Sequence, residues 1–508
     1  AYNVAIGHEA GQNVTTGTEN TIIGGLAGDA LTTGEDNTAL GYNALTSAQE
    51  DGRNTAIGRG ALAGQNGAGT AYNTALGYNA GGAVSTGAQN TIIGGLAGDA
   101  LTTGSNNVAV GRSALSAEQE GGRNTAIGYA ALLTQNTTGF AYNVAVGYNA
   151  GENVTTGTQN TIIGALAGDA LTTGGYNIAL GYEALSTEDS GNKSVAIGWR
   201  ALKTQNYNGD AYNVAIGHAA GQVITTGTQN VVIGGLAGDA LTTGGSNIAI
   251  GYEALSTEDT TGGAVAVGYQ ALKTQNTDST SYNTAVGHQA GENITTGVQN
   301  TLIGGLAGDA LTTGDRNVAL GTYALSTENT GSRSTAIGWY SLLAQNNGGI
   351  AYNTAVGYNS GSSITTGINN TIIGALAGDA LTDGDNNVVL GHQALSTEQT
   401  GGRNVAIGTY ALQDLNTGLN AYNIAVGHAA GSQMTTGTSN TLIGGLTGDA
   451  LTTGDNNVAL GYASLSAETA GDRSVAIGNF ALQVQNNTIN ADVYNTAVGY
   501  SAGSAITT

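Results

Sequence analysis

Acidic side chains recur at fixed intervals along this 508-residue sequence and are the first candidates for chemistry. One Asp stands in each copy of a phrase close to Gly-Leu-Ala-Gly-Asp-Ala-Leu-Thr-Thr-Gly, at Asp29, Asp99, Asp169, Asp239, Asp309, Asp379 and Asp449. Carboxylates are ligands that hard cations prefer, so three chains that met at an axis could hold an ion there. An Asp in a Gly-rich turn also caps that turn through its own backbone. The sequence leaves both interpretations open.

The His residues give no sign of catalysis or metal binding. Each follows a turn Gly, and no ligand or nucleophile recurs with it: His8, His218, His288, His392 and His428. Cys is absent, which excludes disulfides and thiolate metal sites, and no phosphate-binding Gly-Lys-Ser/Thr loop occurs. We therefore expect exposed turn histidines, no enzyme and no cofactor.

Acidic loops precede a regularly placed base. The loops include Glu118-Gln119-Glu120 and Glu188-Asp189. The bases are Arg53, Arg123, Lys193, Arg333, Arg403 and Arg473. The pattern predicts surface salt bridges worth ~0.2–1 kcal/mol each, which help to set the register.

The overall charge narrows the class of partner. The net charge is −23, with 12 Lys and Arg against 35 Asp and Glu. Nucleic-acid binding needs clustered cations, so we expect no nucleic-acid partner. An acidic exterior keeps long particles apart. No run of 18 apolar residues occurs, so we expect no membrane insertion in this segment.

A five-residue phrase, Asn54-Thr55-Ala56-Ile57-Gly58, organises the whole chain. It occurs 29 times; the last residue is always Gly, and the first is Asn in 25 copies, the exceptions being Ser194, Ala264, Ser334 and Ser474. Successive copies lie 17, 17, 17 and 19 residues apart, so four coils make a 70-residue block. The first block sets the repeat positions at Asn3, Gly7, Asn20, Gly24, Asn37, Gly41, Asn54 and Gly58.

The blocks define the expected domain organisation. They span 3–72, 73–142, 143–212, 213–282, 283–352, 353–422 and 423–494, followed by a partial block at 495–508. Short in-phase repeats predict one continuous solenoid over residues 1–508. Because the text starts and stops in mid-pattern, we expect a piece of a longer chain.

The phrase reads as a short strand that ends in a tight turn, which makes the fold all-β. Thr55 and Ile57 should point to one face, and Asn54 and Ala56 to the other. Gly58 should adopt a positive φ. Ala44-Leu45 and its equivalents suggest a second short strand. Stacking one coil on the next, ~4.8 Å apart, predicts a parallel β-solenoid in which Asn either forms a hydrogen-bonded ladder or favours the turn before the strand.

Each coil holds few apolar side chains, many of them Ala, which makes a thin core. Both faces of the strand are apolar or small, so both should be buried. One face can pack inside the coil and the other against neighbouring chains. We therefore expect an intertwined or coaxial homotrimer.

Three further features distinguish the coils. A Tyr precedes the phrase of each first coil, as at Tyr72, Tyr142 and Tyr212, and acts as a packing collar or as a surface spot. The variable loops of the fourth coils are candidate partner contacts, at Gln65, Asn66, Gln135, Asn136, Gln205 and Asn206. Thr pairs in two of every four coils raise the hypothesis of an ice-binding solenoid.

The phrase Ser194-Val195-Ala196-Ile197-Gly198, with a small residue three positions on, resembles the YadA-like head repeats of trimeric autotransporter adhesins. Asn37 to Leu45 is similar to repeats of phage tail fibres and other surface fibres. The resemblance covers the whole chain and implies a left-handed, trimeric β-roll whose role is adhesion or extension. The coils here are longer than in the adhesin head, and no neck, coiled-coil stalk or membrane anchor occurs, which favours a fibre shaft.

Together these patterns predict an extracellular structural fibre on a virion or cell surface, serving as a rigid extended spacer. The alternative is an adhesin head that binds a host glycan or receptor through the fourth-coil loops. Ice binding is the second alternative.

Overall fold

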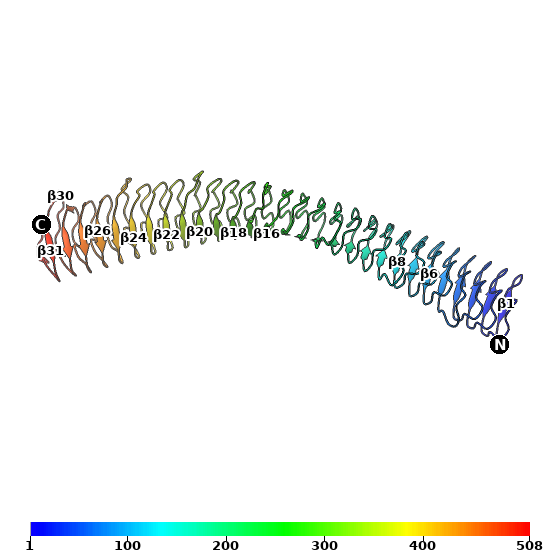
Figure 1. Cartoon of the computed structure of the whole chain (residues 1–508). Coiled ribbons are helices and arrows are strands. Elements are labelled where there is room, and N and C mark those ends of the chain that lie inside the picture. The colour runs from blue at the N-terminus through cyan, green and yellow to red at the C-terminus, as the bar shows by residue number, and fades with distance from the viewer. Residues whose placement is uncertain (1) are drawn as a thin grey trace. The chain divides into compact units, whose positions relative to one another are not determined.

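The computed structural model describes residues 2–508 as a parallel β-solenoid of about 29 turns, and no helix occurs among these residues (Figure 1). The predicted all-β solenoid fold is therefore confirmed. The chain divides into two compact units, Ala1–Ala249 and Ile250–Thr508, which are described separately. Among the described residues, no helix is long and apolar enough to cross a membrane.

Nearly all strands are three residues long and come from the repeated phrase. The first unit contains β1 (Val4–Ile6), β2 (Thr21–Ile23), β3 (Thr38–Leu40), β4 (Thr55–Ile57), β5 (Thr74–Leu76), β6 (Thr91–Ile93), β7 (Val108–Val110), β8 (Thr125–Ile127), β9 (Val144–Val146), β10 (Thr161–Ile163), β11 (Ile178–Leu180), β12 (Val195–Ile197), β13 (Val214–Ile216) and β14 (Val231–Ile233). β15 (Ile248–Ile250) contains the point of division.

The second unit continues the same pattern. It contains β16 (Val265–Val267), β17 (Thr284–Val286), β18 (Thr301–Ile303), β19 (Val318–Leu320), β20 (Thr335–Ile337), β21 (Thr354–Val356), β22 (Thr371–Ile373), β23 (Val388–Leu390), β24 (Val405–Ile407), β25 (Ile424–Val426), β26 (Thr441–Ile443), β27 (Val458–Leu460), β28 (Gly471–Asp472), β29 (Val475–Ile477), β30 (Ala491–Asp492) and β31 (Thr496–Val498). β28 pairs with β30 at the edge of the last full block.

Within each unit every coil stacks on the next with like residues in register, and the strands form one row (Figure 1). Thr38 pairs with Thr55, 17 residues on, whereas Thr55 pairs with Thr74, because the fourth coil is two residues longer. Each strand therefore forms parallel ladders with the strands before and after it.

The middle residue of each strand faces the inside, as the alternation predicted. Ala39 and Ala56 are fully buried, and the larger Ile22 takes this position in the second coil. The flanking residues of the strand face outward and remain partly exposed. The core of a coil thus consists of one strand residue, a small residue from the turn and one or two Leu, Ile or Val side chains.

The phrase Asn side chains form a hydrogen-bonded ladder inside the coil. The backbone N–H of Asn37 donates to Oδ1 of Asn20 at 3.0 Å, and Nδ2 of Asn20 donates to the carbonyl of Gly34 at 2.8 Å. Asn37 is fully buried, and its Oδ1 in turn accepts a hydrogen bond from the backbone N–H of Asn54. In the first three coils of a block this ladder satisfies both ends of the Asn side chain, whereas in the fourth coil the Nδ2 atoms of Asn54, Asn124 and Asn404 are buried without a partner.

The phrase Gly is required for two reasons. Gly24 has a φ of +135°, a region that side chains disfavour. A Cβ built on Gly24 would lie 2.5 Å from the carbonyl oxygen of Gly41 in the next coil. The close stacking of coils at this column therefore leaves no room for a side chain.

The second strand expected at Ala44-Leu45 is absent, and a turn takes its place. Asn43 and Leu45 adopt positive φ values of 57° and 55°, so the chain reverses direction around the buried Ala44. Leu45 still donates its N–H to the carbonyl of Ala61, which stacks the turns as well as the strands. The sequence pattern misled because a small residue followed by Leu suits either conformation.

Candidate interaction surfaces

The strands of each unit present an uncharged face to the outside. In the 29 phrase strands, the first and third residues are always Thr, Val, Ile or Leu, and their side chains point away from the core. Leu40 and Leu76 are 42% and 44% exposed. None of the 47 charged residues that make up the chain's Lys, Arg, Asp and Glu content lies in this face. We call it the outward strand face.

An interrupted aromatic column is built from the residue directly after the phrase Gly, which is Tyr, Trp or His in many coils but Gly or Ala in the second coil of every block, as at Gly95 and Ala165. Tyr129 and Tyr148 stack with ring centroids 5.3 Å apart, and Trp199 and His218 stack at 4.6 Å. Rings on successive coils meet because the coils stack in register. All five His residues occupy this column and are exposed, as the sequence predicted.

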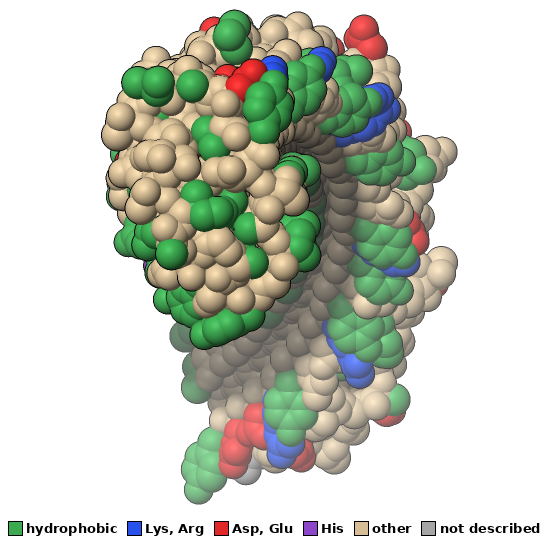
Figure 2. Space-filling view, turned by 90° about the vertical axis from the view of Figure 1, so that its left-hand side faces the viewer, with side chains coloured by type: hydrophobic (Ala, Val, Ile, Leu, Met, Phe, Trp, Pro, Cys, Tyr) green, Lys and Arg blue, Asp and Glu red, His purple; other side chains and the backbone are tan. Residues whose placement is uncertain are grey.

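In six of the seven blocks, the Tyr that precedes the next first coil lies on the surface beside the base at the entrance of the fourth coil. Arg123 donates to the hydroxyl of Tyr142 at 2.6 Å, with its guanidinium 5.4 Å from the ring centroid. Tyr72, Tyr142 and Tyr212 are 49%, 46% and 50% exposed in the single chain, and the packing-collar interpretation stays a prediction. Figure 2 shows Lys and Arg side chains beside hydrophobic ones at intervals along one side of its view. We call each pair of a Tyr hydroxyl and the Arg or Lys that donates to it, such as Tyr142 and Arg123, a Tyr–base clamp.

Some bases also contact an acidic side chain, but not in the way that the sequence suggested. Lys193 lies 2.6 Å from Asp210 of the fourth-coil loop, and Arg473 lies 2.6 Å from Asp492. Hydrogen bonds from Lys193 lower the pKa of Asp210. The expected partners Glu118 and Glu188 are instead buried.

These buried carboxylates form a lock between the third and fourth coils. Glu118 accepts hydrogen bonds from the backbone of Gly121 at 2.7 Å, from Nε2 of Gln135 at 3.0 Å and from the hydroxyl of Thr137 at 3.1 Å. A buried charge needs such donors to offset its lost hydration. The same lock recurs at Glu188, Glu258, Glu328, Glu398 and Glu468, and Asp51 replaces it in the first block.

The lock corrects the prediction that Gln65, Gln135 and Gln205 are partner contacts. All three side chains are fully buried, since they donate to the lock carboxylates. Asn66, Asn136 and Asn206 are exposed at the start of the variable loops. The sequence did carry a signal for the lock, because Glu118 and Gln135 stand 17 residues apart and their equivalents recur with the block.

Beyond these Asn residues the fourth-coil loops expose apolar side chains that differ between blocks. Phe140 is 55% exposed, Leu419 is 70% exposed and Ile489 is 71% exposed. Other loops present Thr70 or Asp210 instead. The loops therefore offer a partner chemically different contacts at each block.

The recurrent Asp is half-buried in the turn of the second coil. In Asp99, Asp309 and Asp449 the Oδ1 atom is buried without a hydrogen-bond partner. Burial raises the pKa of Asp309 to about 6, against a smaller lowering by its own backbone amide. That backbone contact is the one expected of a turn cap. Among the described residues, no group of three or more His, Cys, Asp or Glu is placed to hold a metal ion.

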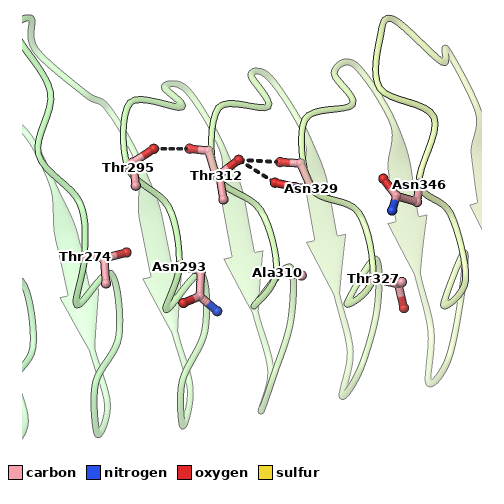
Figure 3. A pocket seen from close by; sticks show the side chains of 8 residues that line it. All are labelled: Thr274, Asn293, Thr295, Ala310, Thr312, Thr327, Asn329 and Asn346. Carbon is pink, nitrogen blue, oxygen red and sulfur yellow. Dashed lines mark hydrogen bonds between the residues drawn. The ribbon is translucent and has the colours of Figure 1, made fainter.

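The Thr residues line a shallow polar groove along the coils. In the second unit this groove has a volume of about 440 Å³ and is lined by Asn293, Thr295, Thr312, Asn329 and neighbours (Figure 3). Thr295 and Thr312 donate their hydroxyls to the carbonyls of Thr312 and Asn329 at 3.2 Å each. The hydroxyl protons are thus used within the chain.

Comparison with protein-family models and with curated proteins gives no match. A function can therefore be inferred only from the surfaces of the chain itself.

Proposed function

We propose that this chain is the shaft of an extracellular fibre: a homotrimer of left-handed solenoids that acts as a rigid spacer on a virion or cell surface. The observation that carries the proposal is the outward strand face, which has no charged side chain although the chain has a net charge of −23. Charged groups are depleted where proteins associate, and like charges would repel copies of the same acidic chain. A second and a third copy are therefore the partners that this face suits.

The extent of the face supports permanent association. Each strand from β1 to β14 presents two outward side chains, which are Thr, Val, Ile or Leu. Among them, Leu40, Leu76 and Ile127 are between 37% and 44% exposed. Monomers rarely expose contiguous apolar patches above a few hundred Å². Three chains around one axis bury three equivalent faces in closed symmetry. The thin core of each coil would then be reinforced by the contact between chains.

Light scattering followed by electron microscopy of the same sample tests the proposal. We expect a trimeric straight rod that grows by ~19 Å for each added 70-residue block, since four coils at ~4.8 Å are added. Ile57→Glu combined with Ile127→Glu should break the trimer, while Thr16→Glu, in an exposed turn, should not. A compact monomer with the wild-type sequence, or a trimer that survives both Glu substitutions, would contradict it.

A second candidate function is adhesion to a host glycan or protein through the fourth-coil loops. The exposed and variable Phe140 and Leu419 favour it, because conspicuous apolar side chains on loops mark contact sites. Exchanging loop 136–140 with loop 276–280 should abolish binding to the host surface without changing the length of the rod. Unchanged binding after the exchange would remove a loop-specific adhesin.

Ice binding is disfavoured. An ice-binding array needs free hydroxyls in a continuous row, whereas Thr295 and Thr312 donate theirs to the backbone and Asn329 interrupts the row. Measurable thermal hysteresis would reverse this conclusion.

A further inference from the structure

The corner between the third and fourth coils is built alike in six of the seven blocks. In the second block it contains the Glu118 lock, the Tyr–base clamp of Arg123 and Tyr142, and a backbone bridge between Gly122 and Phe140. Equivalent bridges occur in the first, third, fifth and sixth blocks, and β28 pairs with β30 in the seventh. Three separate contacts thus hold the fourth-coil loop against the coil before it.

The fourth block departs from this plan at the position of the base. Gly263 stands where the other blocks have Arg or Lys, so Tyr282 has no cation from this position beside its ring or hydroxyl. Tyr282 is 64% exposed, compared with 46% for Tyr142 and 52% for Tyr352. One of the three contacts is therefore missing.

The neighbouring positions of the same block also differ. Ala264 replaces Asn or Ser, so the block lacks a side-chain oxygen here, such as the one with which Asn124 accepts from the N–H of Asn143 at 3.1 Å or Ser194 accepts from Gln205 at 2.8 Å. Ser281 replaces an Ala, and its buried hydroxyl has no hydrogen-bond partner. A buried hydroxyl without a partner destabilises the closed form relative to one in which water reaches it.

The backbone bridge is lost as well. Gly262 and Thr280 lie outside any ladder, whereas their equivalents Gly122 and Phe140 are bridged. The N–H of Ser281 still donates to the carbonyl of Gly262 at 3.2 Å, and Gln275 still donates to Glu258 at 2.9 Å. The hydroxyls of Thr261 and Thr277 lie 2.9 Å apart and add a contact next to the lock. The lock therefore remains, and the contacts that are lost lie in the outer part of the corner.

We propose that residues 259–263 and 276–282 form a built-in point of local opening, at which the fourth-coil loop detaches while the lock and the strands stay in place. Proteins open locally where backbone hydrogen bonds are few and buried contacts are weak, and here several deficits coincide in one block of an otherwise regular repeat. In a fibre this corner would be the first to yield under load. The opening itself does not depend on the fibre proposal, because it follows from contacts within one chain.

Hydrogen exchange followed by mass spectrometry tests this on the full chain in its native oligomeric state. Amides of 259–263 and 276–282 should exchange about tenfold faster, after correction for intrinsic rates, than the equivalent amides of 119–123 with 136–142 and of 329–333 with 346–352. The β16 strand between the two segments and the β17 strand after them should stay as protected as β8 and β9.

Two reciprocal variants make the test specific. Gly263→Arg with Ala264→Asn should lower exchange at 259–263 and 276–282 to the level of the other blocks. Arg is compatible with the left-handed backbone here, since Gly263 has a φ of 77° and Arg53 adopts 61° beside the equivalent Thr70. Arg123→Gly with Asn124→Ala should raise exchange at 119–123 and 136–142. Equal protection of all corners in the wild-type chain, or unchanged exchange in both variants, would overturn the proposal.

Discussion

The N–H of Asn177 donates to Oδ1 of Asn160 at 2.9 Å, across a separation of 17 residues. Asn160 is fully buried, so water makes no hydrogen bond to its side chain. Its Nδ2 donates to the carbonyl of Gly174 at 2.9 Å. One side chain thus joins two coils at two backbone groups. This relationship recurs along each unit, so the inner Asn adds a regular side-chain link to the backbone hydrogen bonds between coils.

Replacing Asn160 by Ala should therefore destabilise the chain strongly. The substitution leaves the N–H of Asn177 and the carbonyl of Gly174 buried without partners, at a cost of ~2–4 kcal/mol. Chemical denaturation monitored by circular dichroism measures the effect. Asn153→Ala, at an exposed loop position, is the control and should cost less than ~1 kcal/mol. Equal effects of the two substitutions would show that the ladder is not the stabilising link.

In the fourth coil we expect a much smaller effect for the same residue type. The Nδ2 atoms of Asn54 and Asn124 are buried without partners, whereas the equivalent Ser194 accepts a hydrogen bond from Gln205 at 2.8 Å. Asn54→Ser and Asn124→Ser should change stability by less than ~1 kcal/mol, because removing the unsatisfied Nδ2 donor is offset by losing the Oδ1 that accepts the N–H of Asn73 or Asn143. The reverse change, Ser194→Asn, should have an equally small effect. Thermal unfolding of the three variants side by side decides the sign.

The carboxylate lock should depend on its charge more than on its Gln. Glu118→Gln keeps the shape but places an amide donor against Gln135 or against the N–H of Gly121, so we expect a loss of ~2–4 kcal/mol. Gln135→Leu should cost only ~1–2 kcal/mol, because the sixth block already has Leu415 beside Glu398. A Gln135→Leu effect as large as that of Glu118→Gln would mean that the pair, rather than the backbone donors, holds the carboxylate.

The recurrent Asp predicts how stability changes with pH. Burial raises the pKa of Asp169 to about 6, with smaller raising effects from Glu152 and Glu183 and a lowering one from Lys203. The folded chain thus favours the protonated acid, so this stabilising contribution is complete below about pH 4 and is lost as the pH rises through 6. Asp169→Asn and Asp309→Asn should raise the unfolding temperature at pH 7.5 and flatten its dependence between pH 4 and 6.

An exposed acid supplies the control for that experiment. Glu120→Gln, in the third-coil loop, should leave the slope of stability between pH 4 and 6 unchanged. A slope that persists in the Asp169→Asn, Asp309→Asn double variant would assign the pH dependence to other groups.

Much of the fold could be predicted because the strand phrase is an unambiguous signal. The alternation of Thr55, Ala56 and Ile57 identified the inner and outer faces, and the constant Gly58 indicated a special backbone conformation, here a φ of +131°. The turn at Ala44-Leu45 was missed because Leu45 adopts a left-handed conformation that its own side chain disfavours. Stacking against neighbouring coils imposes it, and a sequence window contains no such information.

The candidate surfaces divide in the same way. Exposure of the His residues followed from their place after a turn Gly. The roles of Glu118 and Arg123 were misassigned because both were expected to pair with the nearest opposite charge. Their actual partners lie 17 and 19 residues away, on the next coil. The length of the coil determines which side chains come together there. Charge alone could not predict that choice.

The 17- and 19-residue spacings of the lock and the clamp also limit how such a gene can grow. Duplicating a single coil inside a block would insert another coil between Glu118 and Gln135, or between Arg123 and Tyr142. The buried carboxylate of Glu118 would then lose its hydrogen-bond partner on the next coil. Duplicating a whole block of 70 codons recreates every one of these neighbours. Unequal recombination should therefore yield a stable chain only when it adds or removes a whole block, because only then does every lock and clamp keep its partners. Molecules of this kind are expected to differ in length by whole blocks.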